Sequence, residues 1–321
     1  MISPSEKLES DFNLISPFGL VNIGNTCYAN SAFQLFFSID EITEYLTIDN
    51  NWVESLKDIC EIKHIKTVPE VIELVKKYLV VILYRFLLKQ ETVKNPSNIL
   101  SLLNSKQNSF HFIPGEQNDS HEFLNILLDS LNEEIYKINN RLELETKIKK
   151  VDYKSIITDL LQININTTTF YLDKSEESTI QEKDLFIYLY PRPEDKTIQD
   201  LIDNMKNTEE VKDEQKITRK SQIVKSSKYV ICVISRFKDF MKNNQSIEIL
   251  ENITIADKVY SVHSIISHSG SLFGGHYINY SNRNGKWYLF NDSSVSEVNL
   301  DYTLKSVSSG SAYVVLYKLK D

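Results

Sequence analysis

The chain has 321 residues, enough for one large domain or two small ones whose core needs no disulfide bonds. Hydrophobic residues make up 41% and charged residues 25%, and the net charge of −8 with a pI near 5.4 argues against binding to nucleic acid or to an anionic membrane surface. The three cysteines have no paired spacing, and the sequence shows no signal peptide and no membrane-spanning run. We therefore expect an intracellular protein of the cytoplasm or nucleus.

The first predicted helix follows a polar lead-in, residues 1–17. Gly24 permits a bend, and Asn25 and Thr26 are helix-capping residues ahead of an apolar helical pattern. Cys27 therefore falls in the first turn of a buried helix, where free backbone N–H groups and the helix dipole favour a thiolate. A small buried cysteine is the simpler interpretation, but the glycine turn and the helix-start position favour a nucleophile.

Further helices are expected in the N-terminal half. Residues 42–88 read as helical, and the apolar residues within 71–83 keep the spacing of one packed helix face. Another helix is predicted to start at Asp119, because Glu122 follows three residues later as in a capping box. Residues 132–150 are charged and are predicted to be the solvated end of that helix and a linker.

Beyond residue 160 the pattern changes to short alternating segments, which predict strands. These segments are residues 163–171, 185–190, 229–235, 258–267, 277–280, 286–290 and 313–318. Residues 206–228 are polar without an apolar period and are predicted to be a mobile excursion. A helix-rich half followed by a strand-rich half predicts an α+β fold.

A second set of residues suited to catalysis lies far downstream of Cys27, as is usual for a nucleophile and its base. His276 follows two glycines and precedes an aromatic strand, which lets a substrate backbone approach closely. His268 is predicted to lie in the loop before it. Asn291 and Asp292 come next, and either is a candidate to orient the imidazole. Spacing alone does not separate these two, and only Asp292 carries a charge.

Several motifs together carry a resemblance to a known family. Gly19-Leu-Val-Asn-Ile-Gly-Asn-Thr-Cys-Tyr-Ala-Asn-Ser31 resembles the cysteine box of the ubiquitin-specific proteases. Gly274-Gly-His-Tyr277 with Trp287-Tyr-Leu-Phe-Asn-Asp-Ser-Ser-Val295 resembles their histidine box. Gln117-Asn-Asp-Ser-His-Glu-Phe-Leu124 is similar to the segment between these boxes, and Ala312-Tyr-Val-Val-Leu-Tyr317 to the last core strand. Any one box alone would be weak, and the signal is their occurrence together in the family's order.

The resemblance implies a papain-like cysteine protease fold of the α+β class, with a helical thumb, a β-rich palm and a reduced fingers subdomain. After the lead-in 1–17, the implied catalytic domain is 18–321, with the thumb at about 18–140, the fingers at about 160–230 and the palm in the remainder. Many relatives bind zinc in the fingers through two Cys-x-x-Cys pairs. This chain has Thr167-Thr-Thr-Phe170 near the first pair's position and no cysteine from 61 to 231, so we expect no metal and no cofactor.

The resemblance also implies a function, a thiol-dependent deubiquitinase that hydrolyses the (iso)peptide bond after the C-terminal glycine of ubiquitin. The implied catalytic residues are the nucleophile Cys27, the base His276, the orienting residue Asn291 with Asp292 as a second candidate, and the oxyanion donor Asn22. The implied substrate-binding residues are Gln117, Asp119, Glu122, Phe237, His268, Gly275 and Tyr277. Simpler interpretations are a turn asparagine for Asn22 and a helix cap for Asp119 and Glu122.

The expected partners are ubiquitin and ubiquitinated proteins, the expected oligomeric state is a monomer, and neither nucleic acid nor a membrane is expected as a partner. Two alternatives remain. One is a protease for another ubiquitin-like modifier, and the other is a non-catalytic ubiquitin-binding scaffold. A scaffold would be indicated by loss of Cys27, His276 or Asn291, and all three are present.

Overall fold

The computed structural model describes residues 16–48, 51–106, 115–147, 154–171, 176–205, 208–212, 215–238, 241–271 and 274–320. The chain divides into two compact units, each assembled from segments that are separate in sequence. Residues 1–158 and 282–297 form one, which we call the helical unit, and residues 159–281 and 298–321 form the other, which we call the sheet unit. The segment that carries Asn291 and Asp292 therefore belongs to the same unit as Cys27. Most of the predicted lead-in, residues 1–15, lies outside the described residues.

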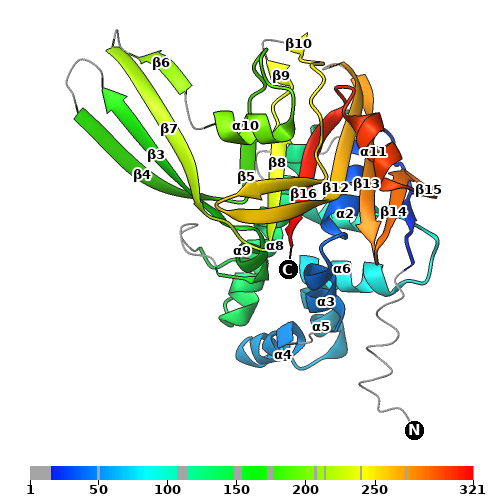
Figure 1. Ribbon diagram of the computed structural model, residues 1–321. Helices are drawn as coiled ribbons and strands as arrows, with labels where there is room; N and C mark the ends of the chain where they lie inside the picture. The colour runs from blue at the N-terminus through cyan, green and yellow to red at the C-terminus, as the bar shows by residue number, and fades with distance from the viewer. Residues whose placement is uncertain are drawn as a thin grey trace. The chain divides into compact units, whose positions relative to one another are not determined.

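The helical unit is built around a helix that begins at Cys27 and is buried along its full length. This helix is labelled α2 in Figure 1. The helices are α2 (Cys27–Phe36), α3 (Asp40–Thr47), α4 (Asn51–Ile62), α5 (Val68–Val75), α6 (Leu79–Leu88), α7 (Ser97–Lys106) and α8 (Ser120–Asn139), with α9 (Ile156–Leu161) at the unit boundary. The strands are β1 (Gly19–Leu20), paired in parallel with β2 (Val93–Lys94), and the neighbours β14 (Lys286–Asn291) and β15 (Ser294–Val298). α2 packs against α8, where the rings of Tyr28 and Phe33 contact Phe123 at centroid distances of 5.8 and 5.0 Å.

The predicted packed face over residues 71–83 is wrong, because two helices meet there. α5 ends at Val75, and Tyr78 has the extended backbone of an N-cap that starts α6. No residue of α5 is buried, whereas most of α6 is. α5 is instead stabilised at its start by a capping box, in which Thr67 and Glu70 exchange hydrogen bonds. The apolar spacing continues across the break between the two helices, and for this reason it resembles the pattern of a single helix.

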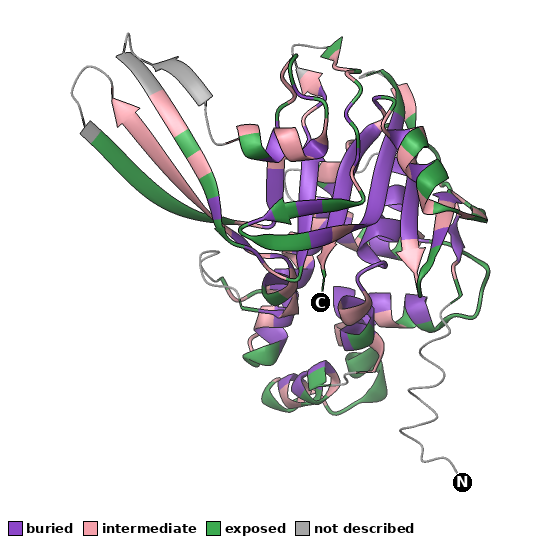
Figure 2. Cartoon of the chain, in the orientation of Figure 1, coloured by how far each residue is buried: buried purple, intermediate pink, exposed green. Residues whose placement is uncertain are grey.

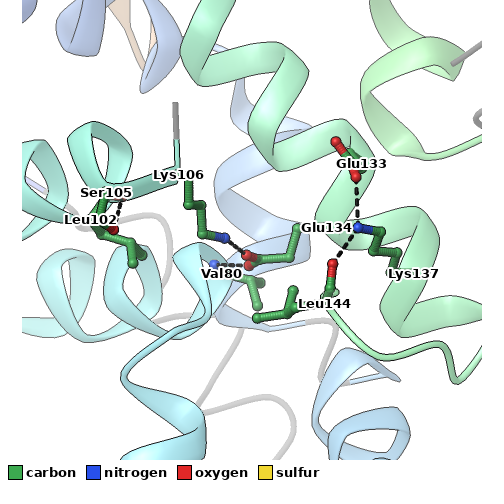
Figure 3. A network of polar contacts seen from close by, with 8 residues as sticks. All are labelled: Val80, Leu102, Ser105, Lys106, Glu133, Glu134, Lys137 and Leu144. Atoms are coloured by element: carbon green, nitrogen blue, oxygen red, sulfur yellow. Dashed lines mark hydrogen bonds and ion pairs between the residues drawn. The ribbon is translucent and has the colours of Figure 1, made fainter. Parts of the chain in front are cut away.

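Charged side chains of α8 are buried among the helices, which corrects the prediction of a solvated helix end for the helical part of residues 132–150. Residues 140–147 are exposed or intermediate in burial, and 148–150 lie outside the described residues. Glu134 is 2% exposed, accepts a hydrogen bond of 2.7 Å from the Val80 N–H and pairs with the Lys106 ammonium (Figure 3). α6 has no side-chain cap from its own N-cap residue, so Glu134 satisfies one of the free N–H groups at that helix start. Lys137 is also buried and donates to a backbone carbonyl in the loop after α8. The charge of Glu134 is compensated by partners distant in sequence, whereas Lys137 also pairs with Glu133 in the preceding turn of α8.

The sheet unit contains a twisted central sheet with the strand order β13-β12-β16-β8-β5. The strands are β5 (Phe186–Leu189), β8 (Tyr229–Ile234), β12 (Lys258–Ser271), β13 (Gly274–Arg283) and β16 (Ala312–Leu319), with β11 (Asn252–Ile255) paired to β12. β5 and β8 are parallel, and the other pairs are antiparallel. β8 is buried on both faces, as Figure 2 shows, and its sequence is accordingly apolar throughout. The helices α10 (Ile198–Asn204) and α11 (Leu300–Val307) and the hairpin β9 (Phe237–Lys238) and β10 (Met241–Lys242) complete the described elements of this region.

A second sheet has the order β4-β3-β7-β6, and nearly all of its described residues are exposed or intermediate in burial (Figure 2). The strands are β3 (Ile163–Tyr171), β4 (Glu176–Asp184), β6 (Thr208–Lys212) and β7 (Gln215–Lys225). Hydroxyl pairs cross between its strands, such as Thr167 with Ser221 at 3.1 Å and Thr168 with Thr179 at 2.9 Å. The predicted mobile excursion at residues 206–228 is wrong, since it contains β6 and β7. Most residues of β7 are polar, and Ile223 and Val224 follow one another instead of alternating with polar residues, so the regular alternation that marks a strand is missing from its sequence.

Every segment predicted as a strand coincides with a strand of the structure, and the helix predicted at Asp119 is α8. In the part of the chain that the structure describes, no helix has both the length and the apolar character needed to span a membrane. The same part contains no cluster of three or more His, Cys, Asp or Glu side chains placed to hold a metal ion.

Candidate active site

Cys27 is the first residue of α2, as the sequence predicts, and its side chain is 3% exposed. Thr26 occupies the N-cap position, but its hydroxyl does not cap the helix and accepts a hydrogen bond of 2.9 Å from the Ile23 N–H. Asn22 takes over part of this task, because its side-chain oxygen accepts from the Thr26 N–H at 3.1 Å. The thiol therefore sits at the positive end of the helix dipole, where negative charge is stabilised.

The turn after β14 presses against the segment that leads to Cys27. A Cβ atom on Gly19 would lie 2.3 Å from the carbonyl oxygen of Ser293, so only a glycine admits this approach. The Leu20 N–H donates to the Asp292 carbonyl at 2.8 Å. The cysteine box and the end of the histidine box, about 270 residues apart in sequence, are thus joined by backbone contacts within the helical unit.

Asp292 is the centre of a polar network in this unit. One carboxylate oxygen accepts from the Asn22 amide at 2.8 Å, and the other accepts from the Asn30 amide at 2.8 Å. Asp292 itself has a left-handed backbone, with φ of 50°, which is uncommon for a residue other than glycine. Both carboxylate oxygens of Asp292 therefore accept hydrogen bonds from residues of the motif that contains Cys27. This favours Asn291, the exposed last residue of β14, as the residue that orients the imidazole, and that role stays a prediction.

The third motif, residues 117–124, is in direct contact with α2, the helix that begins at Cys27. Asp119 is the N-cap of α8, and its carboxylate accepts from the N–H groups of His121 at 2.7 Å and Glu122 at 3.2 Å. The next residue, Ser120, is fully buried and donates to the Tyr28 carbonyl at 2.8 Å. The predicted cap at Asp119 is confirmed, and the predicted contact with substrate is untested.

His276 lies on β13 in the sheet unit, where it is exposed and pairs in register with Ser269 of β12. Its pairing with Cys27 joins residues of the two units and stays a prediction. His268 is not in a loop, as the sequence suggested, but within β12, and it is 3% exposed. Its register partner is Tyr277, one residue after His276. Because successive strand residues face opposite sides of a sheet, His268 and His276 point to opposite faces.

An aromatic cluster surrounds His268, with ring centroids at 4.4 Å to Tyr277 and 5.6 Å to Phe237. Its carbonyl accepts a hydrogen bond of 2.7 Å from the Lys242 ammonium. Burial, with smaller effects from Lys242 and His276, lowers the pKa of His268 from 6.5 to about 4. The imidazole of His268 is therefore neutral at physiological pH.

Gly275 has a structural explanation besides substrate access. A Cβ atom there would lie 2.2 Å from the His268 ring nitrogen Nε2 and 2.4 Å from the Ser269 carbonyl oxygen. The space over Gly275 is thus filled by His268, and the close approach of a substrate backbone remains a prediction. Of the other predicted substrate-binding residues, Gln117 and Glu122 are exposed and Phe237 and Tyr277 belong to the aromatic cluster. Although Glu122 as a residue is exposed, partial desolvation of its carboxyl group raises its pKa, and the nearby Asp119 adds a smaller effect in the same direction.

Comparisons with known proteins agree with this arrangement. The family model "Ubiquitin carboxyl-terminal hydrolase" matches residues 18–317. The chain belongs to the ubiquitin carboxyl-terminal hydrolase family. Among curated relatives it is 24% identical to "Probable ubiquitin carboxyl-terminal hydrolase 16" of Schizosaccharomyces pombe, over 100% of this chain and 71% of that protein. It is also 24% identical to "Ubiquitin carboxyl-terminal hydrolase 2" of Bos taurus, over 94% of this chain and 55% of that protein.

The fold is similar to that of a chain in a solved complex. That structure, described as the SAGA DUB module Ubp8/Sgf11/Sus1/Sgf73 bound to monoubiquitin, superposes with a TM-score of 0.72 at 15% identity, over 98% of this chain and 70% of that one. The predicted ubiquitin-specific protease family and its papain-like α+β fold are therefore confirmed. The chain spans about half the length of several curated relatives, for example 43% of the protein "Ubiquitin carboxyl-terminal hydrolase 17" of Arabidopsis thaliana.

Two residues of this hydrolase were not predicted from the sequence to belong to the site. One lies on α2 and the other contacts it. Asn30 stands in the cysteine box, one helical turn after Cys27, and binds Asp292. Ser120 stands in the third motif and joins α8 to α2. Each is a small polar residue at a position that the apolar pattern makes buried, and a buried polar side chain needs a partner. That signal was available, but the identity of each partner was not.

Proposed function

We propose that the protein is a thiol-dependent deubiquitinase that hydrolyses the peptide or isopeptide bond after the C-terminal glycine of ubiquitin. The observation that carries the proposal is the position of Cys27 at the first residue of a buried helix, next to an Asn22 amide held by Asp292. Family membership supports the same chemistry.

In the proposed reaction, the Cys27 thiolate attacks the glycine carbonyl and the C–N bond breaks, leaving a thioester. His276 takes the thiol proton and transfers it to the departing amine. A water molecule then hydrolyses the thioester, with His276 again removing the proton, and regenerates the thiol. Asn291 orients the imidazole in this scheme.

Asn22 is suited to stabilise the oxyanion that forms on the carbonyl oxygen. Its side-chain nitrogen carries two N–H donors, and Asp292 accepts one of them. The second N–H and the backbone N–H of Cys27 are the proposed donors to the oxyanion. A donor whose direction is fixed before the reaction stabilises the developing charge without reorganising at that moment.

The proposed partners are ubiquitin and ubiquitinated proteins. Ubiquitin's C-terminal tail carries two arginines, and Asp119 and Glu122 offer carboxylates to them. We further propose a monomer that acts without a cofactor or metal, in the cytoplasm or nucleus, and without a nucleic acid or membrane partner.

The direct test is hydrolysis of ubiquitin that carries a C-terminal fluorogenic amide. The wild type should release the fluorophore, and Cys27→Ala should not. Parallel substrates built on other ubiquitin-like modifiers separate the first alternative, because faster turnover of one of them would reassign the substrate. A folded wild type that binds ubiquitin but turns over none of these substrates would instead support the scaffold.

A further inference from the structure

Asn30 lies three residues after Cys27 on α2, so the two side chains share a face of the helix. Asn30 is 2% exposed. Its amide nitrogen donates to an Asp292 carboxylate oxygen at 2.8 Å and to the Val21 carbonyl at 3.3 Å, and it lies 3.5 Å from the Leu20 carbonyl oxygen. One buried amide therefore contacts both the turn after β14 and the segment that leads to the nucleophile.

The amide oxygen of Asn30 has no hydrogen-bond partner and is buried. A buried acceptor without a partner opposes folding. Rotating the amide by 180° would bring that oxygen against the Asp292 carboxylate, so Asp292 selects the observed orientation. The unpartnered oxygen thus offsets part of the stabilisation that the hydrogen bonds of the amide nitrogen provide, and the clear effect of the side chain is on Asp292.

Asp292 connects Asn30 with Asn22. Its two oxygens are divided between the two amides, one to each at 2.8 Å. Fixing one oxygen of a planar carboxylate fixes the direction of the other, because both belong to one rigid group. The hydrogen bond from Asn30 thus determines where Asp292 holds the Asn22 side chain. The side-chain oxygen of Asn22 accepts a hydrogen bond from the N–H of Thr26, the residue directly before Cys27.

We propose that Asn30 is a positioning residue, which orients the Asp292 carboxylate so that Asp292 holds the Asn22 amide at the start of the nucleophile helix. The inference rests on the proposed function for the oxyanion role of Asn22. This positioning role differs from a structural role, in which the only effect of Asn30 would be to bind α2 to the Val21 carbonyl. A structural role predicts loss of stability, and a positioning role predicts loss of turnover.

A reciprocal exchange tests the contact. Asn30→Asp places two carboxylates against each other and should lower kcat on the fluorogenic ubiquitin substrate by about 100-fold, with KM changed less than about threefold. Adding Asp292→Asn restores a donor–acceptor pair of reversed polarity, and the amide oxygen at 292 still accepts from Asn22. The double variant should therefore recover kcat by at least about tenfold over Asn30→Asp.

Two further variants separate positioning from folding. Asn30→Leu removes the donor together with the unpartnered acceptor, and it should lower kcat by about tenfold or more while the Tm stays within a few degrees. Asn25→Asp is the matched control, since it makes the same change five residues away, where the side chain donates to the Gly115 carbonyl and not to Asp292. It should leave kcat within about twofold. The rate at which iodoacetamide alkylates Cys27 should change little in every variant, because the thiol itself is not displaced.

The outcomes are distinguishable from failure of the proposed function. A wild type without activity on ubiquitin refutes the deubiquitinase and, with it, the catalytic purpose of Asn30. An active wild type with fully active Asn30→Leu overturns the inference alone. The inference is also overturned if the double variant has neither a higher kcat nor a higher Tm than Asn30→Asp, because positions 30 and 292 are then not coupled.

Discussion

The two regions that carry the predicted catalytic residues are held in different ways. Around Cys27, side-chain hydrogen bonds join segments distant in sequence, with Asp292 between Asn22 and Asn30. Around His276, the pairing of β12 with β13 sets the position, and His268 fills the aromatic interior behind it. A polar network can lose its geometry through one substitution that spares the core. A site built on paired strands and a buried imidazole is instead coupled to folding and to pH.

The largest effect should come from His276 itself. His276→Ala removes the proposed base and should lower kcat/KM on the fluorogenic ubiquitin substrate by about 10⁴-fold. Because the side chain is exposed, the Tm should change by no more than a few degrees. Steady-state kinetics and calorimetry on one preparation measure both quantities. Retention of more than a few per cent of the activity would assign the base to another residue.

On the cysteine side, Asp292→Ala should lower kcat by about 100-fold, since the Asn22 amide loses its anchor. It should also lower the free energy of unfolding by about 1–3 kcal/mol, because the buried Asn30 amide loses a charged acceptor. Asn291→Ala is the comparison, since it should lower kcat with little loss of stability. If Asp292→Ala alters the pH dependence of kcat in the way that Asn291→Ala does, then Asp292 orients the imidazole.

On the histidine side, stability should depend on pH through His268. Its pKa is about 4 in the folded protein and near 6.5 when exposed, so the unfolded chain binds the proton more readily between these values. The free energy of unfolding should therefore fall as the pH is lowered from about 6.5 to 4, by on the order of 2 kcal/mol.

His268→Phe should remove that slope from urea unfolding curves measured across this pH range. His64→Asn is the control, because His64 is exposed and has a left-handed backbone that asparagine tolerates. The control should keep the slope. An unchanged slope in His268→Phe would place the titrating group elsewhere.

The smallest effect concerns Asp119, whose two possible roles can be separated. Asp119→Ala removes the cap and should lower the free energy of unfolding by about 1 kcal/mol. Asp119→Asn keeps an N-cap acceptor and removes only the charge. If the charge binds an arginine of the ubiquitin tail, both variants should raise KM, by about tenfold for a charge-assisted contact. A normal KM for Asp119→Asn would leave Asp119 as a cap alone.

Several local signals were read correctly from the sequence, whereas contacts between distant segments were not. Cys27 at a helix start and Asp119 at a cap depend on a few neighbouring residues, and both were predicted. Glu134 is charged yet buried, because its partner Lys106 and the α6 N-terminus reach it only in the fold. The pairing of Asp292 with Asn30 joins residues 262 apart and has no local signal at all.

The strands show the same division. The buried strands of the central sheet carry continuous or alternating apolar residues and were predicted. β7 is a full strand with polar residues on both faces, so periodicity did not detect it. α5 and α6 were merged because apolar spacing continues across the extended backbone of Tyr78.

The central claim is that Cys27 is the nucleophile for the bond after the C-terminal glycine of ubiquitin. Ubiquitin with a C-terminal electrophile should form a one-to-one covalent adduct with the wild type, and peptide mapping by mass spectrometry should locate the bond at Cys27. Cys232 is buried in β8 and its pKa is raised to about 12, and burial also raises the pKa of Cys60, so neither should react. An adduct on Cys60 or Cys232, or a folded wild type that forms none, would contradict the account.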